Sequence, residues 1–316
     1  MNAFNKFVGL TLILGLLHAC GSKPNPEQEE DYQKAASFFA ADESFYPILD
    51  EELYYFTTQT LDSITPLYIN EQDAVKKVMK LETWLAFTTR QFTQKERQNL
   101  IDRKYMPRAI PLAYDGLAII VNNANPDTCI TVTDFARILK GEVSAWKDLY
   151  PQNTLGEIDV VFDNPLSSTV RWCVDSILGG QQFNAKNIGA VQTSAAVIDY
   201  VEKHENALGI IGSNWLNDKR DTTNVTFKKN ISVMGVSKMK TAEKYNSWKP
   251  YQYYLYNGNY PLRRTIYALL NDTRNGIPSS FTHFIQLPKG QKIILRAGLL
   301  PQTANMNVRD VIVNKK

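Results

Sequence analysis

The sequence predicts an α/β protein in which most strands of the sheet are parallel. Short apolar segments alternate with amphipathic ones along nearly all of the 316 residues, and this alternation is typical of strands that are followed by helices. The segment Ala207–Gly212, ALGIIG, is apolar throughout, as expected for a strand that is buried on both faces. Polar turns follow several apolar segments, and ligands of α/β proteins bind at such turns.

The composition allows two domains and narrows the classes of function. The chain is 44% hydrophobic and 21% charged, as in ordinary folded proteins. The net charge of +3 and the lack of a basic block argue against nucleic acid as a partner. His18, His204 and His283 show no metal-ligand spacing, so we expect no metal and no cofactor. Nucleophile-elbow, Walker and dinucleotide motifs are also missing, so we do not expect an enzyme.

Residues 1–19 have the features of a bacterial lipoprotein signal peptide. Lys6 precedes an apolar run at 7–17 that is too short for a membrane span, and His18-Ala19 leads into Cys20. We expect Cys20 to carry the lipid, residues 20–34 to form a flexible tether, and the protein to lie in the periplasm, anchored to a membrane. An ordinary secretory leader with an unrelated cysteine is the alternative.

The two other cysteines, Cys129 and Cys173, leave two possibilities open. An exported protein could pair them in a disulfide. Because Cys173 is predicted inside a helix and Cys129 just before one, two free thiols are an equal expectation.

The first half of the folded region is predicted to alternate strictly between strand and helix. Asp42 or Ser44 would cap the first helix, and Thr93 with Glu96 would form a capping box at the third. The expected order is strand 35–40, helix 45–56, strand 64–69, helix 71–81, strand 84–87 and a helix from residue 93.

The second half begins with a long strand at 109–122, interrupted at Asp115-Gly116, that could pass between two domains. A strand at 231–236 could run back. Between and after them we expect, in order, helix 134–140, strand 160–162, helix 170–178, strand 188–191, helix 195–203, strand 207–212, an apolar segment at 261–270 containing Arg263 and Arg264, helices 281–287 and 291–297, and a late strand at 308–313.

The stretch 160–180, VVFDNPLSSTVRWCVDSILGG, predicts an anion-binding turn. Ser167, Ser168 and Thr169 stand where the helix begins, and unpaired backbone N–H groups at helix starts favour anions. Arg171 adds a full positive charge. The alternative is that Ser167 or Ser168 only caps its own helix.

The turn after strand 84–87 has the same combination of hydroxyl groups and a positive charge before a helix. Thr88, Thr89 and Arg90 lie between a strand end and a helix start. The alternative for Arg90 is an ordinary surface salt bridge.

Several stretches together resemble the substrate-binding proteins of phosphate ABC transporters, within the class of periplasmic binding proteins. The resemblance covers nearly all of the chain after residue 35. It rests on 113–122 (AYDGLAIIVN), 138–149 (ILKGEVSAWKDL), Ser167-Ser168-Thr169, 207–212, and Gly290-Gln291 with 298–301 (GLLP).

The resemblance implies a type 2 periplasmic binding protein, a monomer with two α/β lobes joined by two crossing segments. Lobe 1 would comprise 35–114 with 236–316, and lobe 2 would comprise 115–235. Such a receptor closes on inorganic phosphate and delivers it to an ABC transporter permease in the membrane; it is not an enzyme.

Carried over position by position, Ser44 matches the first-turn hydroxyl of the family, and Thr65 is a weak match for the second turn. Ser167 and Thr169 match its Ser-Gly-Thr turn, with Ser168 in the glycine place. The expected acidic residue of the third turn falls on Thr89, and the expected arginine falls on Asp163. These departures suggest that the charges are exchanged between the turns. Arg90 would pair with the anion, and Asp42 or Asp163 would accept a proton from phosphate.

The sequence leaves three alternative functions open. The same fold could bind sulfate or molybdate, which need no proton acceptor. The chain could be a surface lipoprotein that serves as an interaction module. It could also be a hydrolase, which would turn over a phosphoester.

Overall fold

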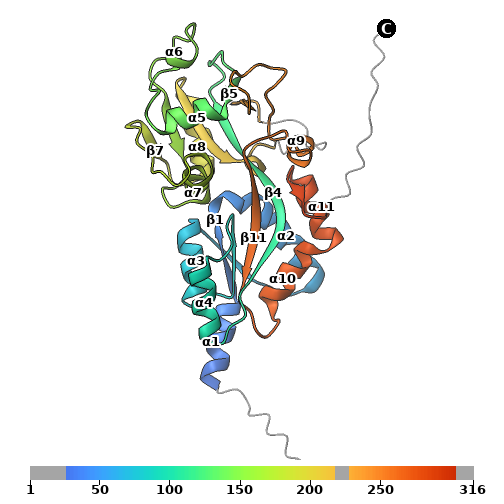
Figure 1. The fold of residues 1–316 in the computed structure, drawn as a ribbon. Coiled ribbons are helices and arrows are strands. Elements are labelled where there is room, and N and C mark those ends of the chain that lie inside the picture. The colour runs from blue at the N-terminus through green and yellow to red at the C-terminus, as the bar shows by residue number, and fades with distance from the viewer. Residues whose placement is uncertain (1–25, 218–227, 304–316) are drawn as a thin grey trace, which may run out of the picture.

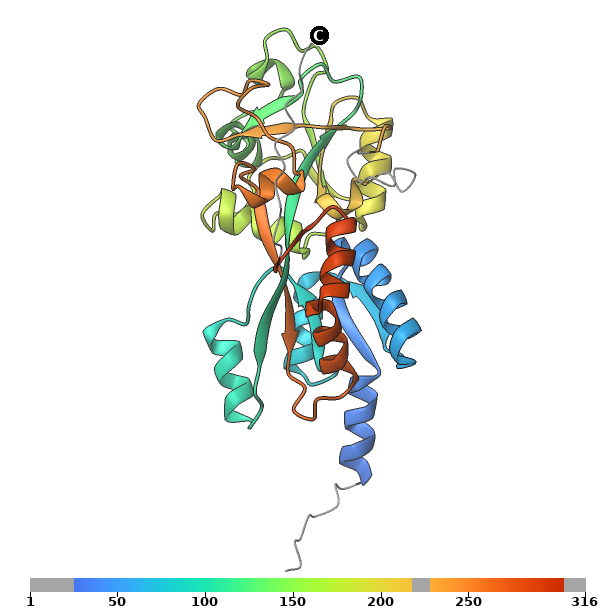
Figure 2. The same ribbon diagram turned by 90° about the vertical axis from the view of Figure 1, so that its right-hand side faces the viewer.

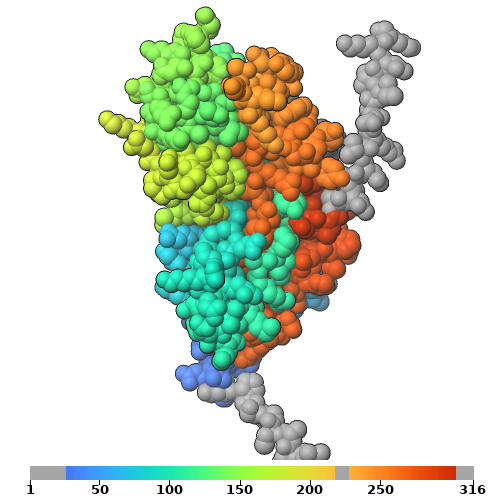
Figure 3. Space-filling model, viewed as in Figure 1, coloured from blue at the N-terminus to red at the C-terminus, as the bar shows by residue number. Residues whose placement is uncertain are grey.

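The computed structural model describes residues 26–217 and 228–303, which form two α/β lobes joined by strands that run through both (Figures 1 and 2). The predicted signal peptide, the predicted lipid-bearing Cys20 and the late strand predicted at 308–313 lie outside the described residues. In the space-filling view, lobe 2, in green and yellow, sits directly on lobe 1, in blue and cyan (Figure 3).

One sheet continues through both lobes in the order β2-β1-β3-β11-β4-β8-β6-β7. Strands β2, β1 and β3 are parallel to one another, as are β8, β6 and β7, while β11 and β4 between them are antiparallel to their neighbours. The bounds are β1 Phe38–Asp42, β2 Thr65–Ile69, β3 Leu85–Thr88, β4 Arg108–Val121, β6 Asp159–Phe162, β7 Ile188–Ala190, β8 Ala207–Gly212 and β11 Arg263–Leu270.

Smaller strands complete this arrangement. Strands β9 (Ser232–Val233) and β12 (Leu300–Pro301) pair with β4, and β10 (Gly235–Ser237) pairs with β5 (Cys129–Thr131) in a separate ribbon.

Strands β4 and β11 are the two connections between the lobes. They pair in antiparallel fashion from Arg263 opposite Gly116 to Leu270 opposite Arg108. The lower parts of both strands pack in the core of lobe 1, while the upper part of β4 and Leu262, which directly precedes β11, pack in the core of lobe 2 (Figure 2). The break predicted at Asp115-Gly116 therefore marks the crossing point within one continuous strand.

Lobe 1 packs helices on both faces of its part of the sheet (Figure 1). Phe39 lies at the centre of its core, with its ring centroid 5.1 Å from that of Phe87 and 5.4 Å from that of Phe281. The helices are α1 Pro26–Ala36, the 3-10 turn Glu43–Phe45, α2 Tyr46–Thr60, α3 Glu71–Met79, α4 Gln94–Asp102, α10 Ile277–Gln286 and α11 Pro288–Arg296.

Lobe 2 has its own core, in which Trp146 is fully buried. Gly209 on β8 allows close packing of α8, because a Cβ there would lie 2.7 Å from Val201 and 2.8 Å from Val197. The helices are α5 Val132–Leu139, α6 Trp146–Leu149, α7 Ser168–Trp172 with its continuation Cys173–Ile177, α8 Ser194–Lys203, the 3-10 turn Ser213–Trp215 and α9 Gln252–Tyr256.

The structure corrects two of the expected boundaries. The tether predicted at 20–34 is helical from Pro26 onward, and the strand predicted at 35–40 begins later, as β1 (Phe38–Asp42), because helix α1 continues to Ala36 and its Tyr32 stacks on Trp84 at 5.6 Å. The return to lobe 1 occurs at β11 and not at residue 236, because Val236, Leu255, Tyr260 and Leu262 all belong to the core of lobe 2.

Cys129 and Cys173 are free thiols, and Cys173 is buried. Among the described residues, no helix combines the length and apolar character that a membrane crossing requires.

Candidate functional site: a junction between the lobes

The carboxyl ends of the parallel strands of both lobes face each other across the interface. In lobe 1, Asp42 ends β1 and Thr88 ends β3; in lobe 2, Phe162 ends β6 and Gly212 ends β8. The polar turns that follow these strands therefore meet between the lobes, which is the usual ligand position in open α/β sheets.

Arg264 lies at the centre of this interface, and its side chain is fully buried. Its Nη1 donates to Ser168 Oγ of lobe 2 at 2.9 Å, and its Nη2 donates to Ser44 Oγ of lobe 1 at 3.3 Å. The two hydroxyl oxygens are themselves 3.3 Å apart. One guanidinium thus joins a hydroxyl from each lobe. We call Arg264, Asp115, Ser44, Ser168 and Asp42 the junction cluster.

Asp115 holds the guanidinium in place. It lies directly opposite Arg264 on β4, and its Oδ2 accepts from Arg264 Nη2 at 2.7 Å and from Nε at 2.8 Å. Its Oδ1 accepts from the backbone N–H of Ser213 at 3.0 Å. A Cβ on Gly212 would lie 2.9 Å from Arg264 Nη2 and 3.0 Å from Asp115 Oδ2, so glycine leaves the room that this pair occupies.

Asp42 brings a carboxylate into the same cluster. Its Oδ1 accepts from the N–H of Ser44 at 3.0 Å, and its Oδ2 accepts from the N–H of Ser168 across the interface at 2.8 Å. Burial, together with the nearby carboxylates of Asp163 and Glu71, raises the pKa of Asp42 to about 6. A carboxylate of the protein therefore occupies donors that could serve an external anion.

Asp163 organises the hydroxyls that follow β6. Its Oδ1 accepts from Ser167 Oγ at 2.7 Å and from the N–H of Asn164 at 2.9 Å, and it also accepts from Thr169 Oγ. Its Oδ2 is buried and accepts no hydrogen bond from any described residue. Burial raises the pKa of Asp163. One oxygen of this buried acid thus lacks a hydrogen-bond donor among the described residues.

A second ion pair closes the rim of the interface. Glu71 at the start of α3 pairs with Arg171 of lobe 2. Glu71 also accepts from the N–H of Thr89 at 2.6 Å, and Arg171 Nη2 donates to Thr89 Oγ at 2.6 Å. We call Arg171 and Glu71 the rim pair.

Further hydrogen bonds join the lobes at the carboxylate of Glu43 and at the carbonyl of Ser44. Glu43 Oε2 accepts from both the N–H and the hydroxyl of Ser194 at 2.9 Å. Burial raises the pKa of Glu43 to about 7. Asn214 Nδ2 and Trp215 Nε1 each donate to the carbonyl oxygen of Ser44 at 2.9 Å. The lobes are thus held together by polar contacts made by the protein itself.

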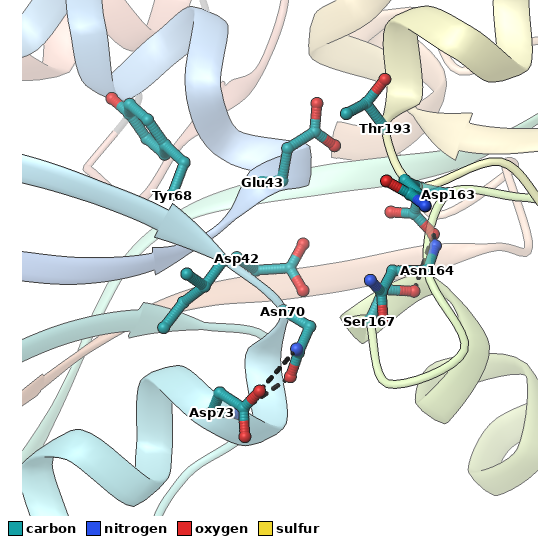
Figure 4. Close-up of a pocket in the computed structure, with 11 residues that line it drawn as sticks. Asp42, Glu43, Tyr68, Asn70, Asp73, Asp163, Asn164, Ser167 and Thr193 are labelled. Atoms are coloured by element: carbon teal, nitrogen blue, oxygen red, sulfur yellow. Dashed lines mark hydrogen bonds between the residues drawn. The ribbon is translucent and has the colours of Figure 1, made fainter.

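Beside the junction cluster lies a hollow of about 330 Å³, which we call the cleft pocket (Figure 4). Asp42 and Glu43 reach toward it from lobe 1, and Asp163, Ser167 and Thr193 face them from lobe 2. Asp73 also lines the pocket, and none of its lining residues is a lysine, an arginine or a histidine.

A family model described as the PBP superfamily domain matches residues 28–287. The chain belongs to the PBP superfamily. The match covers all the strand ends that form the junction cluster, so the superfamily assignment applies to the part of the chain that carries the candidate site.

One characterised protein is a distant relative of this chain in amino-acid sequence. The phosphate-binding protein PstS of Pseudomonas aeruginosa is 23% identical over 216 residues, which are 64% of this chain and 62% of that protein. The matched region thus spans less than two thirds of the relative's own length.

Solved structures share the fold. A putative phosphate ABC transporter substrate-binding protein from Clostridium perfringens, with bound phosphate, matches with a TM-score of 0.68 and 22% identity, over 84% of this chain and 99% of that one. An ABC-type phosphate transport receptor from Vibrio cholerae matches with a TM-score of 0.62 and 22% identity, over 83% and 98%. The fold is therefore that of a type 2 periplasmic binding protein.

The structure brings most of the predicted site residues of this PBP superfamily member to the interface. Ser44 and Ser168 meet at Arg264, Ser167 and Thr169 bind Asp163, and Thr89 joins the rim pair through Arg171. Ser167 also caps α7, as the alternative expected.

Within the described part of the chain, three predicted residues make no hydrogen bond across the interface. Thr65 is exposed at the start of β2, opposite Phe38, whereas the strand end that faces lobe 2 is Ile69, opposite Asp42. Arg90 donates to both carboxylate oxygens of Glu96 at 2.7 and 2.8 Å, which is a pair within lobe 1. The Thr88 hydroxyl donates to the carbonyl of Arg90 at 2.7 Å. The proposed exchange of charges therefore does not use Arg90.

Sequence reasoning missed Arg264, Asp115 and Glu71. An arginine inside an apolar segment was the available signal for Arg264, because a charge in a buried strand requires a partner. That partner, Asp115, stood at the predicted break of the other crossing strand.

Proposed function

We propose that this chain is a substrate-binding receptor that captures inorganic phosphate between its lobes and delivers it to an ABC transporter permease. The junction cluster carries the proposal: a buried arginine directs its two terminal nitrogens at hydroxyls from opposite lobes, Ser44 and Ser168. The names of the relative from Pseudomonas aeruginosa and of the two solved receptors support phosphate as the ligand.

Phosphate would take the place that the Asp42 carboxylate holds in this structure. The N–H groups of Ser44 and Ser168 now donate to Asp42, and the two hydroxyls and Arg264 lie beside them. A tetrahedral anion accepts hydrogen bonds in several directions at once, so it can bind both lobes simultaneously. Closure around the ligand then follows from contacts that need both lobes.

Asp42 would accept the proton of the bound phosphate once it is displaced. Its raised pKa places it where proton sharing with phosphate is easy. Sulfate has no such proton at neutral pH, so a buried carboxylate facing it would remain unpaired at a cost of about 1–3 kcal/mol. The structure thus supports an acceptor for phosphate at Asp42, with Asp163 as the neighbouring acid.

The remaining parts of the proposal concern delivery. The chain would be a monomer without catalytic activity, held in the periplasm by lipid on Cys20. A receptor tethered in this way stays near the membrane and meets its permease at high local concentration.

Isothermal titration of the delipidated protein with phosphate, sulfate and molybdate tests the proposal. We expect phosphate to bind at least tenfold more tightly than sulfate, and Ser168→Ala to weaken phosphate binding about tenfold while the fold, monitored by circular dichroism, persists. Equal affinity for sulfate would favour another oxyanion receptor. Failure to bind any of the three anions would favour an interaction module, and hydrolysis of a phosphoester would contradict the receptor.

A further inference from the structure

The cleft pocket has properties that inorganic phosphate does not explain. Its volume of about 330 Å³ lies in the range of sites for small organic ligands, roughly 300–1,000 Å³. Four carboxylic acids line it, namely Asp42, Glu43, Asp73 and Asp163, and no cationic side chain does. Asp73 pairs with Lys76 at 3.0 Å. An anion alone would leave this space unfilled and the charges of Asp42, Glu43 and Asp163 without a cation in the pocket.

One carboxylate oxygen of Asp163, at the edge of the cleft pocket, lacks a hydrogen-bond donor in the described part of the chain. The residue is 1% exposed, it lines the pocket, and its Oδ2 accepts no hydrogen bond from the described residues. Figure 4 shows this side chain at the edge of the gap that separates it from Asp42 and Glu43. Buried carboxylate oxygens are nearly always hydrogen-bonded, so an orphaned one indicates a missing donor.

The neighbouring acids point to the kind of donor. Burial and mutual repulsion raise the pKa values of Asp42 and Glu43, and burial raises that of Asp163. Acids in this condition gain most from a cation that binds among them. An ammonium group, with three N–H donors and one positive charge, satisfies a ring of carboxylate oxygens from both lobes.

The pocket and the junction cluster are contiguous. Asp42 belongs to both, since it accepts from Ser168 and also lines the pocket, and Ser167 on the pocket wall directly precedes Ser168. A ligand whose oxyanion lies against Arg264 could therefore place a nearby group among the acids.

We propose that this receptor, in addition to inorganic phosphate, binds a small zwitterion, a phosphate monoester or phosphonate that carries a primary ammonium on a short carbon chain. The oxyanion would bind at Arg264, Ser44 and Ser168, and the ammonium would bind Asp163 Oδ2 and Glu43 in the cleft pocket. This inference rests on the proposed oxyanion site and specifies the class of its ligand.

Titration calorimetry with four probes tests the assignment: phosphate, ethyl phosphate, O-phosphoethanolamine and ethanolamine. We expect phosphoethanolamine to bind about tenfold more tightly than ethyl phosphate, which has the same chain without the charge, and ethanolamine alone to bind weakly. This comparison needs no variant, so it stands even if a substituted protein fails to fold.

A matched pair of variants locates the effect. In Glu43→Gln the affinity ratio of phosphoethanolamine to ethyl phosphate should fall toward one, whatever the absolute affinities become. In Glu96→Gln, which removes a carboxylate that lies outside the pocket and pairs with Arg90, the ratio should stay unchanged. A ratio that is unchanged in both variants would overturn the assignment of Glu43 and the pocket.

The outcomes separate this inference from the proposed function. If phosphate binds and phosphoethanolamine binds no better than ethyl phosphate, the zwitterion is excluded and the phosphate receptor stands. If phosphoethanolamine binds and phosphate does not, the zwitterion stands and inorganic phosphate is excluded. If no phosphorus compound binds, both proposals fail.

Discussion

Two ion pairs link the elements that meet at the interface, and they differ in what lobe opening does to them. Arg264 and Asp115 lie opposite each other on the crossing strands, and both side chains are fully buried. Arg171 and Glu71 come from different lobes, and the arginine side chain is 27% exposed. The pairing of β4 with β11 holds the first ion pair together, whereas an opening of the lobes would separate the second.

This difference indicates that the two ion pairs have different structural roles. The buried pair is a permanent anchor that holds a guanidinium at the junction, and breaking it would leave an unpaired charge in the interior. In the proposed receptor the rim pair would form only when the lobes close, and the partial exposure of Arg171 limits what the pair contributes. A receptor needs both: a fixed group to bind the ligand, and weak contacts that close and reopen around it.

The largest expected effect follows from breaking the anchor. Arg264→Gln leaves Asp115 buried without its cation, so the free energy of unfolding should fall by about 3–5 kcal/mol. Urea denaturation at pH 7 measures it. The double variant Arg264→Gln/Asp115→Asn should recover part of the loss, because no buried charge remains. A loss below 1 kcal/mol in the single variant would show that the pair is not an anchor.

A smaller effect on the free energy of unfolding is expected from the titration of Glu43, which joins the lobes through hydrogen bonds to Ser194 and not through an ion pair. Its pKa is raised from 4.5 to about 7, so the folded state favours the protonated acid. Stability from this group is present at pH 4 and is lost as pH rises through 7. Relative to Glu43→Gln, which does not titrate, the wild type should lose about 1–2 kcal/mol between pH 4.5 and 7.5. An unfolding difference that does not vary with pH would contradict the raised pKa.

The smallest effect should come from the rim pair. Glu71→Gln keeps the hydrogen-bonding shape but removes the charge that Arg171 binds. Glu71 is buried, but Arg171 is 27% exposed and keeps Asp175 as a partner, so no unpaired charge is left in the interior and we expect the free energy of unfolding to change by less than about 1 kcal/mol. Small-angle scattering of the ligand-free protein should instead show a more open average shape. Asp175→Asn, which removes the exposed partner of Arg171 within lobe 2, is the control and should leave the shape unchanged. A loss as large as that of Arg264→Gln would erase the distinction between the two pairs.

The sequence allowed the prediction of the site's general position, because local patterns determine where strands end and helices begin. The caps at Asp42, Asn70, Thr93 and Thr131 are where side-chain chemistry requires them. The hydroxyls of Ser44 and Ser168 could be foreseen for the same reason: each follows a predicted strand.

The choice of arginine could not be predicted, because it depends on pairing between distant segments. Arg90 stood in a favourable turn, but Glu96, the acidic member of the adjacent capping box, binds it. Arg264 reaches the junction only because β11 pairs with β4 in a register that sets it opposite Asp115. Strand register across a separation of 149 residues leaves no local trace.

The N-terminal helix was missed for a different reason. Its first turns are polar and acidic and resemble a solvated tether, with Glu27 and Glu29 near the start of the helix. Its stability depends on a tertiary contact, the packing of Tyr32, Ala35 and Ala36 against Trp84. Such contacts override local composition.

The most direct test of the central claim compares phosphate binding in two matched arginine variants. Arg264→Lys keeps the charge but loses the fork that reaches both hydroxyls, and Arg90→Lys makes the same change at the arginine held by Glu96. By isothermal titration, we predict that Arg264→Lys weakens phosphate binding at least tenfold and that Arg90→Lys leaves it unchanged. Unchanged binding in Arg264→Lys, or a loss confined to Arg90→Lys, would contradict an oxyanion site at the junction of the lobes.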